Sequence, residues 1–173
     1  MEGGSRSTQP SAVSSKVITH SSPSFKGFTP ASETSSRIKQ ANRAVDTKAE
    51  LLLRRAVWAL GLRYRKNVST LPGKPDLVFP SARLVVFCDG DFWHGRDWRQ
   101  LKGQLERRAN ARYWIPKIEA NRRRDAVHRR ALRQAGWTVL SLWETDILRH
   151  PKAAAAKITA ALVVSRHIKA RTT

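Results

Sequence analysis

The sequence predicts an α/β or α+β fold, in which a β-sheet is flanked by helices. The first observation is a pair of apolar runs, residues 76–79 and 84–88, separated by a turn at residues 80–82, which is typical of a β-hairpin. The second is a third apolar run at residues 137–143. The third is that amphipathic helical patterns, at residues 46–60 and 110–134, flank the hairpin in the sequence. This order of elements favours one layered domain.

The remaining segments divide the chain into three parts. Residues 1–36 are rich in Ser, Thr, Gly and Pro, which predicts a disordered tail because such a segment cannot bury enough apolar surface. Residues 37–150 are predicted to form the folded domain, and the alanine-rich residues 151–173 a C-terminal helical extension.

Within the predicted domain, local signals mark the element ends. We expect Asp46 to cap the first helix and Gly61 to end it. Arg54, on that helix, is expected to point away from the core. Residues 62–65 alternate as a half-buried strand does, and the basic residues 96–108 are expected to form an exposed loop near a phosphate backbone.

Composition narrows the function before any motif is considered. The 173 residues include 33 Lys and Arg against 13 Asp and Glu, a formal net charge of +20, which is typical of proteins that bind a polyanion such as nucleic acid. The single cysteine excludes an intrachain disulfide and a cysteine-rich zinc site. No apolar run is long enough for a membrane span, and no signal-peptide pattern is present, so we expect a cytosolic protein.

Acidic residues and a histidine follow the predicted strands directly. Asp76 begins the first strand of the hairpin and Asp89 ends the second, with Asp91 and His94 close behind. Carboxylates that converge from adjacent strands suit a hard cation such as Mg²⁺. A histidine beside such a cation can orient or deprotonate a water.

Two further features have more than one interpretation. Glu50 lies in the first turn of the first helix, where it either complements the helix dipole or contributes to a site. On the long helix, spacings of three and four place Trp114, Lys117, Asn121 and Arg124 on one face. That face suits nucleic acid, through charge, an amide and a stacking ring, or it is a solvated basic face.

Five motifs in one order make the chain resemble a known family. They are AELLLRRAVWALGLRYR, LPGKPDLVFP, VFCDGDFWHG, YWIPKIEANRRRD and GWTVLSLWE, and the match as a whole runs from about residue 36 to residue 144. With these motifs the chain resembles the very-short-patch repair (Vsr) endonucleases, a branch of the PD-(D/E)XK nuclease superfamily. The resemblance implies a restriction-endonuclease-like core, a central mixed β-sheet flanked by helices.

The resemblance also implies roles for residues of the predicted site. Asp76 matches the metal-ligating aspartate, and the backbone carbonyl of Cys88 lies where the family supplies a second metal contact. His94 matches the histidine that activates the attacking water, and Glu50 matches a glutamate that holds metal-bound water. The expected cofactor is Mg²⁺, and the expected products carry 5′-phosphate and 3′-hydroxyl ends.

The implied partner is double-stranded DNA. Phe92, Trp93 and Trp114 match aromatics that wedge into the duplex beside the target base pair. Lys117 and Asn121 match residues that contact the mismatched pair. The resemblance further implies a monomer in the cytoplasm, associated with the nucleoid, and a link to mismatch-repair factors or to a cytosine methyltransferase system.

Two departures from the family pattern bear on the site. Asp89 stands where well-known members have a second active-site histidine; an aspartate there could ligate the metal instead. The family's structural zinc needs cysteines and a histidine at the positions that Asp91, Arg96, Trp98 and Thr145 occupy here. No structural zinc is therefore expected, and a salt bridge between Asp91 and Arg96 could hold the segment instead.

The expected function is Mg²⁺-dependent nicking of one DNA strand next to a T:G mismatch. The alternatives are a PD-(D/E)XK nuclease with a different DNA target, linked to a methylation or restriction system, and a basic DNA-binding module without catalysis. Glu50, Asp76 and His94 together argue against the second alternative, because binding alone requires none of them. A ribosome-type RNA-binding protein would leave the acidic cluster between two buried strands unexplained.

Overall fold

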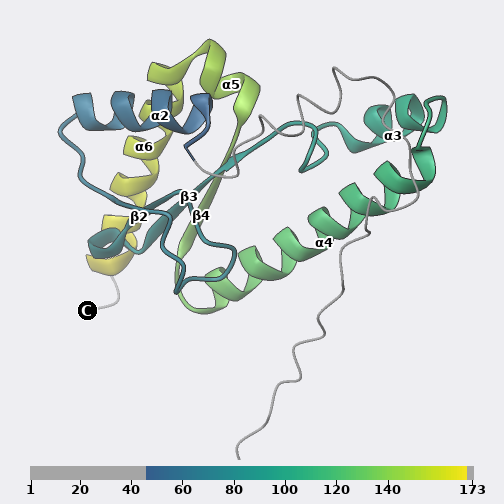
Figure 1. Cartoon of the computed structure of the whole chain (residues 1–173). Coiled ribbons are helices and arrows are strands. Elements are labelled where there is room, and N and C mark those ends of the chain that lie inside the picture. The colour runs from purple at the N-terminus through teal and green to yellow at the C-terminus, as the bar shows by residue number, and fades with distance from the viewer. Residues whose placement is uncertain (1–45, 171–173) are drawn as a thin grey trace, which may run out of the picture.

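The structure, a computed structural model, describes residues 46–170 (Figure 1). The predicted tail at residues 1–36 and the predicted start of the domain at residue 37 lie outside this range. In chain order the elements are α2 (Lys48–Ala59), β1 (Arg65–Lys66), β2 (Leu77–Phe79), the 3₁₀ turn η1 (Pro80–Ala82), β3 (Leu84–Asp89), α3 (Trp98–Glu106), α4 (Ala111–Gln134), β4 (Thr138–Trp143), α5 (Glu144–Arg149) and α6 (Pro151–Ala170).

The four strands form one mixed sheet in the order β1-β2-β3-β4. The predicted hairpin is confirmed: β2 pairs antiparallel with β3, and Val78 lies opposite Val85. β4 pairs parallel with β3, with Leu140 opposite Val86, because the chain crosses over through α3 and α4 between the two strands. The mixed sheet with flanking helices that the resemblance implied is therefore present.

Helices cover both faces of the sheet, as Figure 1 shows with α2 and α6 on one side and α4 on the other. Alternate residues of β3 supply the two cores, because successive side chains of a strand point to opposite faces. Leu84 and Val86 pack in the cluster that includes α2, α5 and α6, whereas Val85 and Phe87 pack with Leu132 of α4. The same alternation directs Asp89, two residues after Phe87, toward α4.

The first helix begins one residue later than predicted. Thr47 is its N-cap and accepts a hydrogen bond from the Glu50 backbone N–H at 3.3 Å, while Asp46 has a positive φ of 60°. The sequence Thr-x-x-Glu at residues 47–50 is the capping-box pattern, which takes precedence over Asp46 as a cap. Gly61 ends the helix at a φ of +74°, a conformation in which glycine avoids the steric cost of a side chain.

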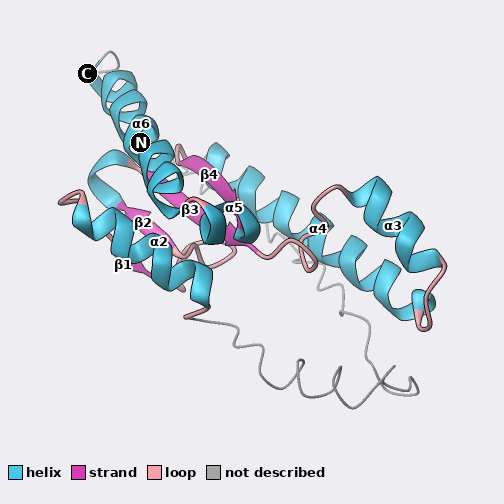
Figure 2. Ribbon diagram, turned by 90° about the horizontal axis from the view of Figure 1, so that it is seen from above, coloured by secondary structure: helices cyan, strands magenta, loops and turns pink. Residues whose placement is uncertain are grey.

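The prediction of a loop at residues 96–108 is wrong, because α3 occupies most of this segment. Its residues Trp98, Leu101 and Leu105 are spaced as one helical face, and Leu105 is buried. α3 packs antiparallel on the first half of α4, and Lys102 of α3 pairs with Glu119 of α4 at 3.3 Å. This helical pair projects away from the sheet, as Figure 2 shows from above.

The C-terminal helix is part of the core and not a separate extension. Ala154, Ala155, Ile158 and Leu162 of α6 are buried in the main apolar cluster, against α2 and β3. Of the helices in residues 46–170, none combines the length and the apolar character needed to cross a membrane.

Candidate active site

A cavity of about 570 Å³ opens where β2 begins and β3 ends, between the first turn of α2 and the middle of α4. The residues with predicted catalytic or metal-binding roles all line it: Glu50, Asp76, Cys88, Asp89 and His94. They come from α2, the two hairpin strands and the loop after β3. The fold thus brings the predicted catalytic residues to one place.

Asp76 is held at the start of β2 by backbone contacts. Its N–H donates to the Val86 carbonyl at 3.0 Å, and one carboxylate oxygen, Oδ2, accepts from the Cys88 N–H at 2.7 Å. Burial raises the pKa of Asp76 to about 6; the negative charges of Glu50 and Asp89 add to the rise, and the Cys88 hydrogen bond partly offsets it. A cation bound beside Asp76 would remove this cost by neutralising the carboxylate.

Glu50 takes part in the local structure of α2 and also lines the cavity. Its Oε1 accepts from the Thr47 hydroxyl at 3.1 Å and its Oε2 from the Asp46 N–H at 3.1 Å, so the carboxylate closes the first turn of the helix. It is buried at 4 % exposure and lies at the same cavity wall as Asp76. Both interpretations of Glu50 thus agree with its position, and its contact with metal-bound water stays a prediction.

Arg54 is buried beside Glu50, which corrects the expectation that it points away from the core. Its Nη2 donates to Glu50 Oε2 at 2.6 Å, and its Nη1 pairs with Asp46. Asp46 therefore helps to fix the guanidinium that orients Glu50. Helical periodicity could not reveal this arrangement, because it places Arg54 one turn from Glu50 without showing that the pair is covered by other elements.

The cavity has a donor set that fits Mg²⁺. Mg²⁺ keeps several waters and is bound in proteins by one or two carboxylates together with substrate phosphates. Asp76 and the backbone carbonyl of Cys88 would supply the protein oxygens, and Glu50, at the same cavity, would hold a metal-bound water. Burial, with the charge of Asp76 as the next contribution, raises the pKa of the Cys88 thiol, so this side chain stays protonated and is a poor ligand. Among residues 46–165, no group of three or more His, Cys, Asp and Glu side chains is arranged to hold a metal ion.

His94 is paired with a carboxylate of α4. Its Nδ1 lies 2.6 Å from Asp125 Oδ2. Burial lowers the pKa of His94, but the hydrogen bond and charge of Asp125, assisted by Asp89, outweigh burial and leave the pKa above its ordinary value. A hydrogen bond at Nδ1 fixes the tautomer and leaves Nε2 for a water or substrate oxygen. In its neutral form, His94 oriented in this way can accept a proton at Nε2.

Asp125 pairs with His94 in the candidate site, and the sequence did not reveal this. It follows Asn121 by one turn, on the face of α4 that was predicted to meet DNA, and it interrupts a run of arginines. A carboxylate within a basic face is the signal that could have revealed it. Only the packing of α4 against the end of β3 identifies its partner as His94.

Asp89 lines the cavity and is paired with an arginine of α4. Arg129 Nη2 donates to Asp89 Oδ1 at 2.6 Å and to Oδ2 at 2.5 Å, while Oδ1 lies 3.8 Å from His94 Nδ1. Because strand alternation directs Asp89 toward α4, both of its oxygens are engaged there. Glu50 is engaged in the same way, by Thr47, Asp46 and Arg54, so ligation of the metal by Asp89 stays a prediction. The Arg129–Asp89 ion pair therefore lies beside the His94 ring.

The segment that carries His94, residues 90–97, is tied to the start of α5 and is here named the histidine loop. Arg96 Nη1 donates to Asp91 Oδ1 at 2.9 Å, which confirms the predicted salt bridge, and Arg96 Nη2 donates to Asp146 Oδ1 at 2.9 Å. Asp91 Oδ2 accepts from the Thr145 N–H at 2.9 Å and from its hydroxyl at 2.8 Å. Burial raises the pKa of Asp91, but these hydrogen bonds from Thr145 and Arg96 hold it below its ordinary value.

These contacts occupy the positions at which the family pattern would place zinc ligands. Asp91, Arg96, Trp98 and Thr145 stand at those positions, and a carboxylate, a guanidinium, an indole and a hydroxyl do not fit a structural zinc, which requires thiolate and imidazole ligands. The same loop is instead closed by ion pairs and hydrogen bonds between Asp91, Arg96, Thr145 and Asp146.

We expect replacement of Arg96 with alanine to slow the nicking step about tenfold at saturating DNA, because a displacement of about 1 Å at a catalytic group can cost up to about 10²-fold. Single-turnover nicking measures this, and DNA affinity should change little. Lys102→Ala, which also removes one ion pair but on the α3–α4 side, is the matched control. An unchanged single-turnover rate in Arg96→Ala would show that nicking does not depend on the ion pairs of Arg96 with Asp91 and Asp146.

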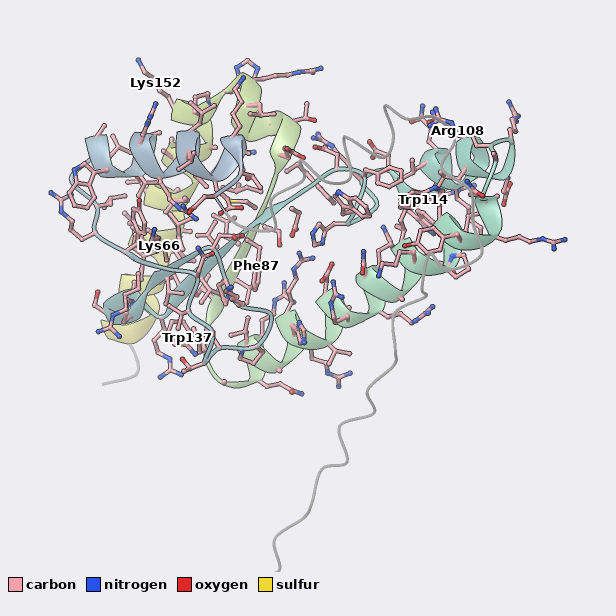
Figure 3. The ribbon with its side chains drawn as sticks, in the orientation of Figure 1. Lys66, Phe87, Arg108, Trp114, Trp137 and Lys152 are labelled. Atoms are coloured by element: carbon pink, nitrogen blue, oxygen red, sulfur yellow. The ribbon has the colours of Figure 1, made fainter. Side chains whose placement is uncertain are left out.

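Three aromatic side chains pack together at the edge of the cavity. Ring centroids are 5.3 Å apart for Phe92 and Trp93, 5.2 Å for Phe92 and Trp114, and 5.6 Å for Trp93 and Trp114. The first two belong to the histidine loop and the third to α4, where Figure 3 shows Trp114 directed toward the loop. The structure thus brings the three predicted wedge residues into one half-exposed cluster beside His94.

The predicted DNA face of α4 has separate parts. Asn121 and Arg124 line the cavity, and Trp114 belongs to the aromatic cluster. Asn121 is only 6 % exposed and its Nδ2 donates to the Trp93 carbonyl at 3.1 Å, so it supports the histidine loop. Lys117, one turn before Asn121, is half-buried on the same face. Contacts of Lys117 and Asn121 with a base pair remain predictions.

The mixed sheet, the acidic cavity at the strand ends and the histidine–carboxylate pair define a DNA endonuclease with a restriction-endonuclease-like fold. Comparison with known proteins agrees: the family model described as DNA mismatch endonuclease Vsr matches residues 28–100. The chain is 45 % identical over 123 residues to the type II nicking enzyme V.NmeDIP of Neisseria meningitidis serogroup C, a match that covers 71 % of this chain and 82 % of that protein.

Two more relatives extend this result. The type II nicking enzyme V.HpaIIP of Haemophilus parainfluenzae is 40 % identical over 125 residues, covering 72 % of this chain and 87 % of that protein. The DNA mismatch endonuclease Vsr of Escherichia coli K12 is 34 % identical over 111 residues, covering 64 % and 69 %. The chain belongs to the Vsr endonuclease family, and it is a DNA nicking endonuclease of the metal-dependent PD-(D/E)XK type.

Proposed function

We propose that this nuclease uses Mg²⁺ and cuts one strand of duplex DNA beside a T:G mismatch. The observation that carries the proposal is the position of the aromatic cluster, Phe92, Trp93 and Trp114, at the rim of the cavity that holds Asp76 and His94. Side chains that wedge between base pairs have to unstack them, which costs least at a mismatched pair. A wedge next to the catalytic cavity therefore favours cleavage where pairing is already weak.

The cleavage chemistry follows from the residues around the cavity. Bound Mg²⁺ would supply a Lewis acid that stabilises charge on the phosphate oxygens. Asp76 would ligate this ion, and Glu50, which lines the same cavity, would hold a water bound to it. His94, oriented through Nδ1 by Asp125, accepts the proton of the attacking water at Nε2.

Basic side chains of α4 provide the binding surface for the DNA backbone. Arg123 and Arg124 are exposed on this helix, Arg124 at the cavity itself. With a net charge of +20, the whole chain attracts a polyanion. Contacts to phosphates position the duplex without reading its sequence, so mismatch preference has to come from the wedge and from Lys117 and Asn121.

A different DNA target is the second candidate function. Relatives named type II nicking enzymes suggest that this chain works beside a restriction–modification system, with a cytosine methyltransferase as its functional partner. This candidate is compatible with the T:G proposal, because deamination of 5-methylcytosine produces T:G pairs. It differs in allowing cleavage of matched or methylated duplexes.

A nicking assay on paired oligonucleotide duplexes tests the proposal. With Mg²⁺ present, we expect strand-specific nicking of a duplex with one T:G pair, at least about 10²-fold faster than of its matched T:A and C:G controls, since opening a stable pair costs a few kcal/mol more. Equal cleavage of all three duplexes would contradict the mismatch preference and favour the second candidate. The sequence around the T:G pair is varied in the same assay.

A further inference from the structure

A second cavity, of about 450 Å³, adjoins the first on the side of α4. Asp89 and His94 form the wall between the two, and Lys74 and Arg124 line both. The residues that line only the second cavity are Ser69, Leu71, Asp125, His128 and Arg129. None of these is used by the chemistry above except Asp125, which supports His94.

The charges around this second cavity leave it favourable to an anion. Its two carboxylates are already engaged: Asp89 accepts two hydrogen bonds from Arg129, and Asp125 is bonded to His94. Arg124 lies 3.7 Å from Asp125 and its side chain is 49 % exposed, so most of its surface remains accessible. Lys74 is exposed at the opposite rim. Two cationic side chains therefore line the cavity, one from the turn before β2 and one from α4.

The position of Lys74 is built into the fold. The Lys74 N–H donates to the Leu71 carbonyl at 3.0 Å, which closes the turn before β2. At the preceding residue, Gly73, a Cβ would lie 3.1 Å from both Cβ and Nδ1 of His128, at a φ of +73°. A glycine is needed for this close approach, because any side chain would push the turn away from α4. The turn is thereby held against α4, and Lys74 lies at the rim of the cavity.

We propose that the second cavity binds a phosphate of the cleaved strand, with Lys74 and Arg124 as its cationic contacts; this rests on the nuclease function proposed above. Successive phosphates of one DNA strand follow each other at about 3.4 Å along the helix axis. A strand that places its scissile phosphate beside Asp76 and His94 therefore has another phosphate within reach across the His94 wall. Leu71 and Phe87 give this cavity an apolar part that suits the sugar.

The phosphate has two sources. It is either the internal phosphodiester next to the scissile one during cleavage, or the terminal 5′-phosphate of the nicked product. Both present the same anionic oxygens to Lys74, so the experiment has one arm for each.

In the first arm, single phosphates on either side of the nick are replaced by neutral methylphosphonates, and kcat/KM is measured for wild type and Lys74→Ala. We expect Lys74→Ala to lose about tenfold on unmodified DNA, the scale of one charged hydrogen bond. At one flanking position the methylphosphonate should slow the wild type by a similar factor and slow Lys74→Ala no further. Lys152→Ala, which removes one lysine from exposed α6, is the matched control, and Lys74→Arg should restore most of the loss.

In the second arm, nicked duplexes with a 5′-phosphate or a 5′-hydroxyl at the nick compete with substrate. Stronger inhibition by the phosphorylated product in wild type, but not in Lys74→Ala, assigns the cavity to the terminal phosphate. The cavity is assigned to the internal phosphodiester if the two products inhibit equally and if, in the first arm, a methylphosphonate at one flanking position slows Lys74→Ala no further.

Two results together would overturn the proposal. The first is that the losses caused by the methylphosphonate and by Lys74→Ala multiply at every flanking position. The second is that the 5′-phosphate and 5′-hydroxyl products inhibit equally, both in wild type and in Lys74→Ala. Both arms use whichever duplex the wild type nicks, matched or mismatched. A failure of the T:G preference therefore leaves this test intact, and a failure of the second cavity leaves the nicking activity intact.

Discussion

Replacement of Asp76 with asparagine is expected to reduce Mg²⁺-dependent nicking at least about 10³-fold, because metal stabilisation of phosphate charge is worth several kcal/mol. Asparagine keeps the shape of the side chain and the oxygen that accepts from the Cys88 N–H. DNA binding should remain close to wild type, since it depends on the arginines of α4 and the aromatic cluster. Single-turnover nicking and equilibrium binding in separate titrations measure the two effects.

The stability of the same variant provides an independent check. Burial and the charges of Glu50 and Asp89 raise the pKa of Asp76 to about 6, above its unfolded value of 3.8. The folded state therefore holds the proton more tightly, and ionisation of Asp76 costs stability at every pH above about 6. At pH 8 in chelator, Asp76→Asn should melt at the same temperature as wild type or higher.

Added Mg²⁺ should raise the melting temperature of the wild type and not that of Asp76→Asn, because only the wild type has the ionised ligand. Glu106→Gln, which removes an exposed carboxylate at the end of α3, is the matched control for charge. Retention of full nicking activity by Asp76→Asn would exclude Asp76 as a metal ligand.

Removal of the His94–Asp125 pair has the second large effect. His94→Ala should slow the single-turnover rate about 10²–10⁴-fold, the usual contribution of a general base. Asp125→Asn should have a smaller effect on the maximal rate and a distinct effect on its pH dependence. Asp125 lies 2.6 Å from His94 Nδ1 and raises the pKa of His94, with Asp89 also raising it and Arg129 opposing.

The sign of the pH effect follows from the role of the neutral imidazole. A base has to be unprotonated, so the wild-type rate should rise with pH through a midpoint above 6.5, the ordinary pKa of histidine. Asp125→Asn removes a contribution that raises this pKa, so the midpoint should move to lower pH. Glu119→Gln, on the same helix but paired with Lys102, should leave the profile unchanged. A profile that does not move in Asp125→Asn would mean that His94 is not the titrating base.

Local sequence signals were sufficient for the elements whose periodicity and end signals agree. The hairpin of β2 and β3, the strand β4 and the long helix α4 lie within one or two residues of their predicted ranges. α3 was missed because the basic residues of segment 96–108 suggested an exposed loop, although Trp98, Leu101 and Leu105 follow helical spacing. The C-terminal helix was recognised as a helix, but its burial against α2 depends on a contact between the two ends of the described chain.

The same limit applies to the site. Asp76 and His94 could be identified because motifs and strand ends mark them in the linear sequence. Asp125 and Arg129 could not be assigned partners, because each acts on a residue more than one element away along the chain. Asp89 shows the difference most clearly: as a residue type it suits a metal, but the alternation of β3 turns it to α4, where Arg129 engages both oxygens.

By itself, then, the sequence determined the catalytic residue types, the basic character and the order of strands and helices, because these depend on composition and on local spacing. The tertiary structure alone decided that Asp89 pairs with Arg129, that Asp125 pairs with His94, and how Asp91, Arg96, Thr145 and Asp146 hold the histidine loop. These pairings depend on distances between elements far apart in the chain, which are set by how the helices pack on the two faces of the sheet.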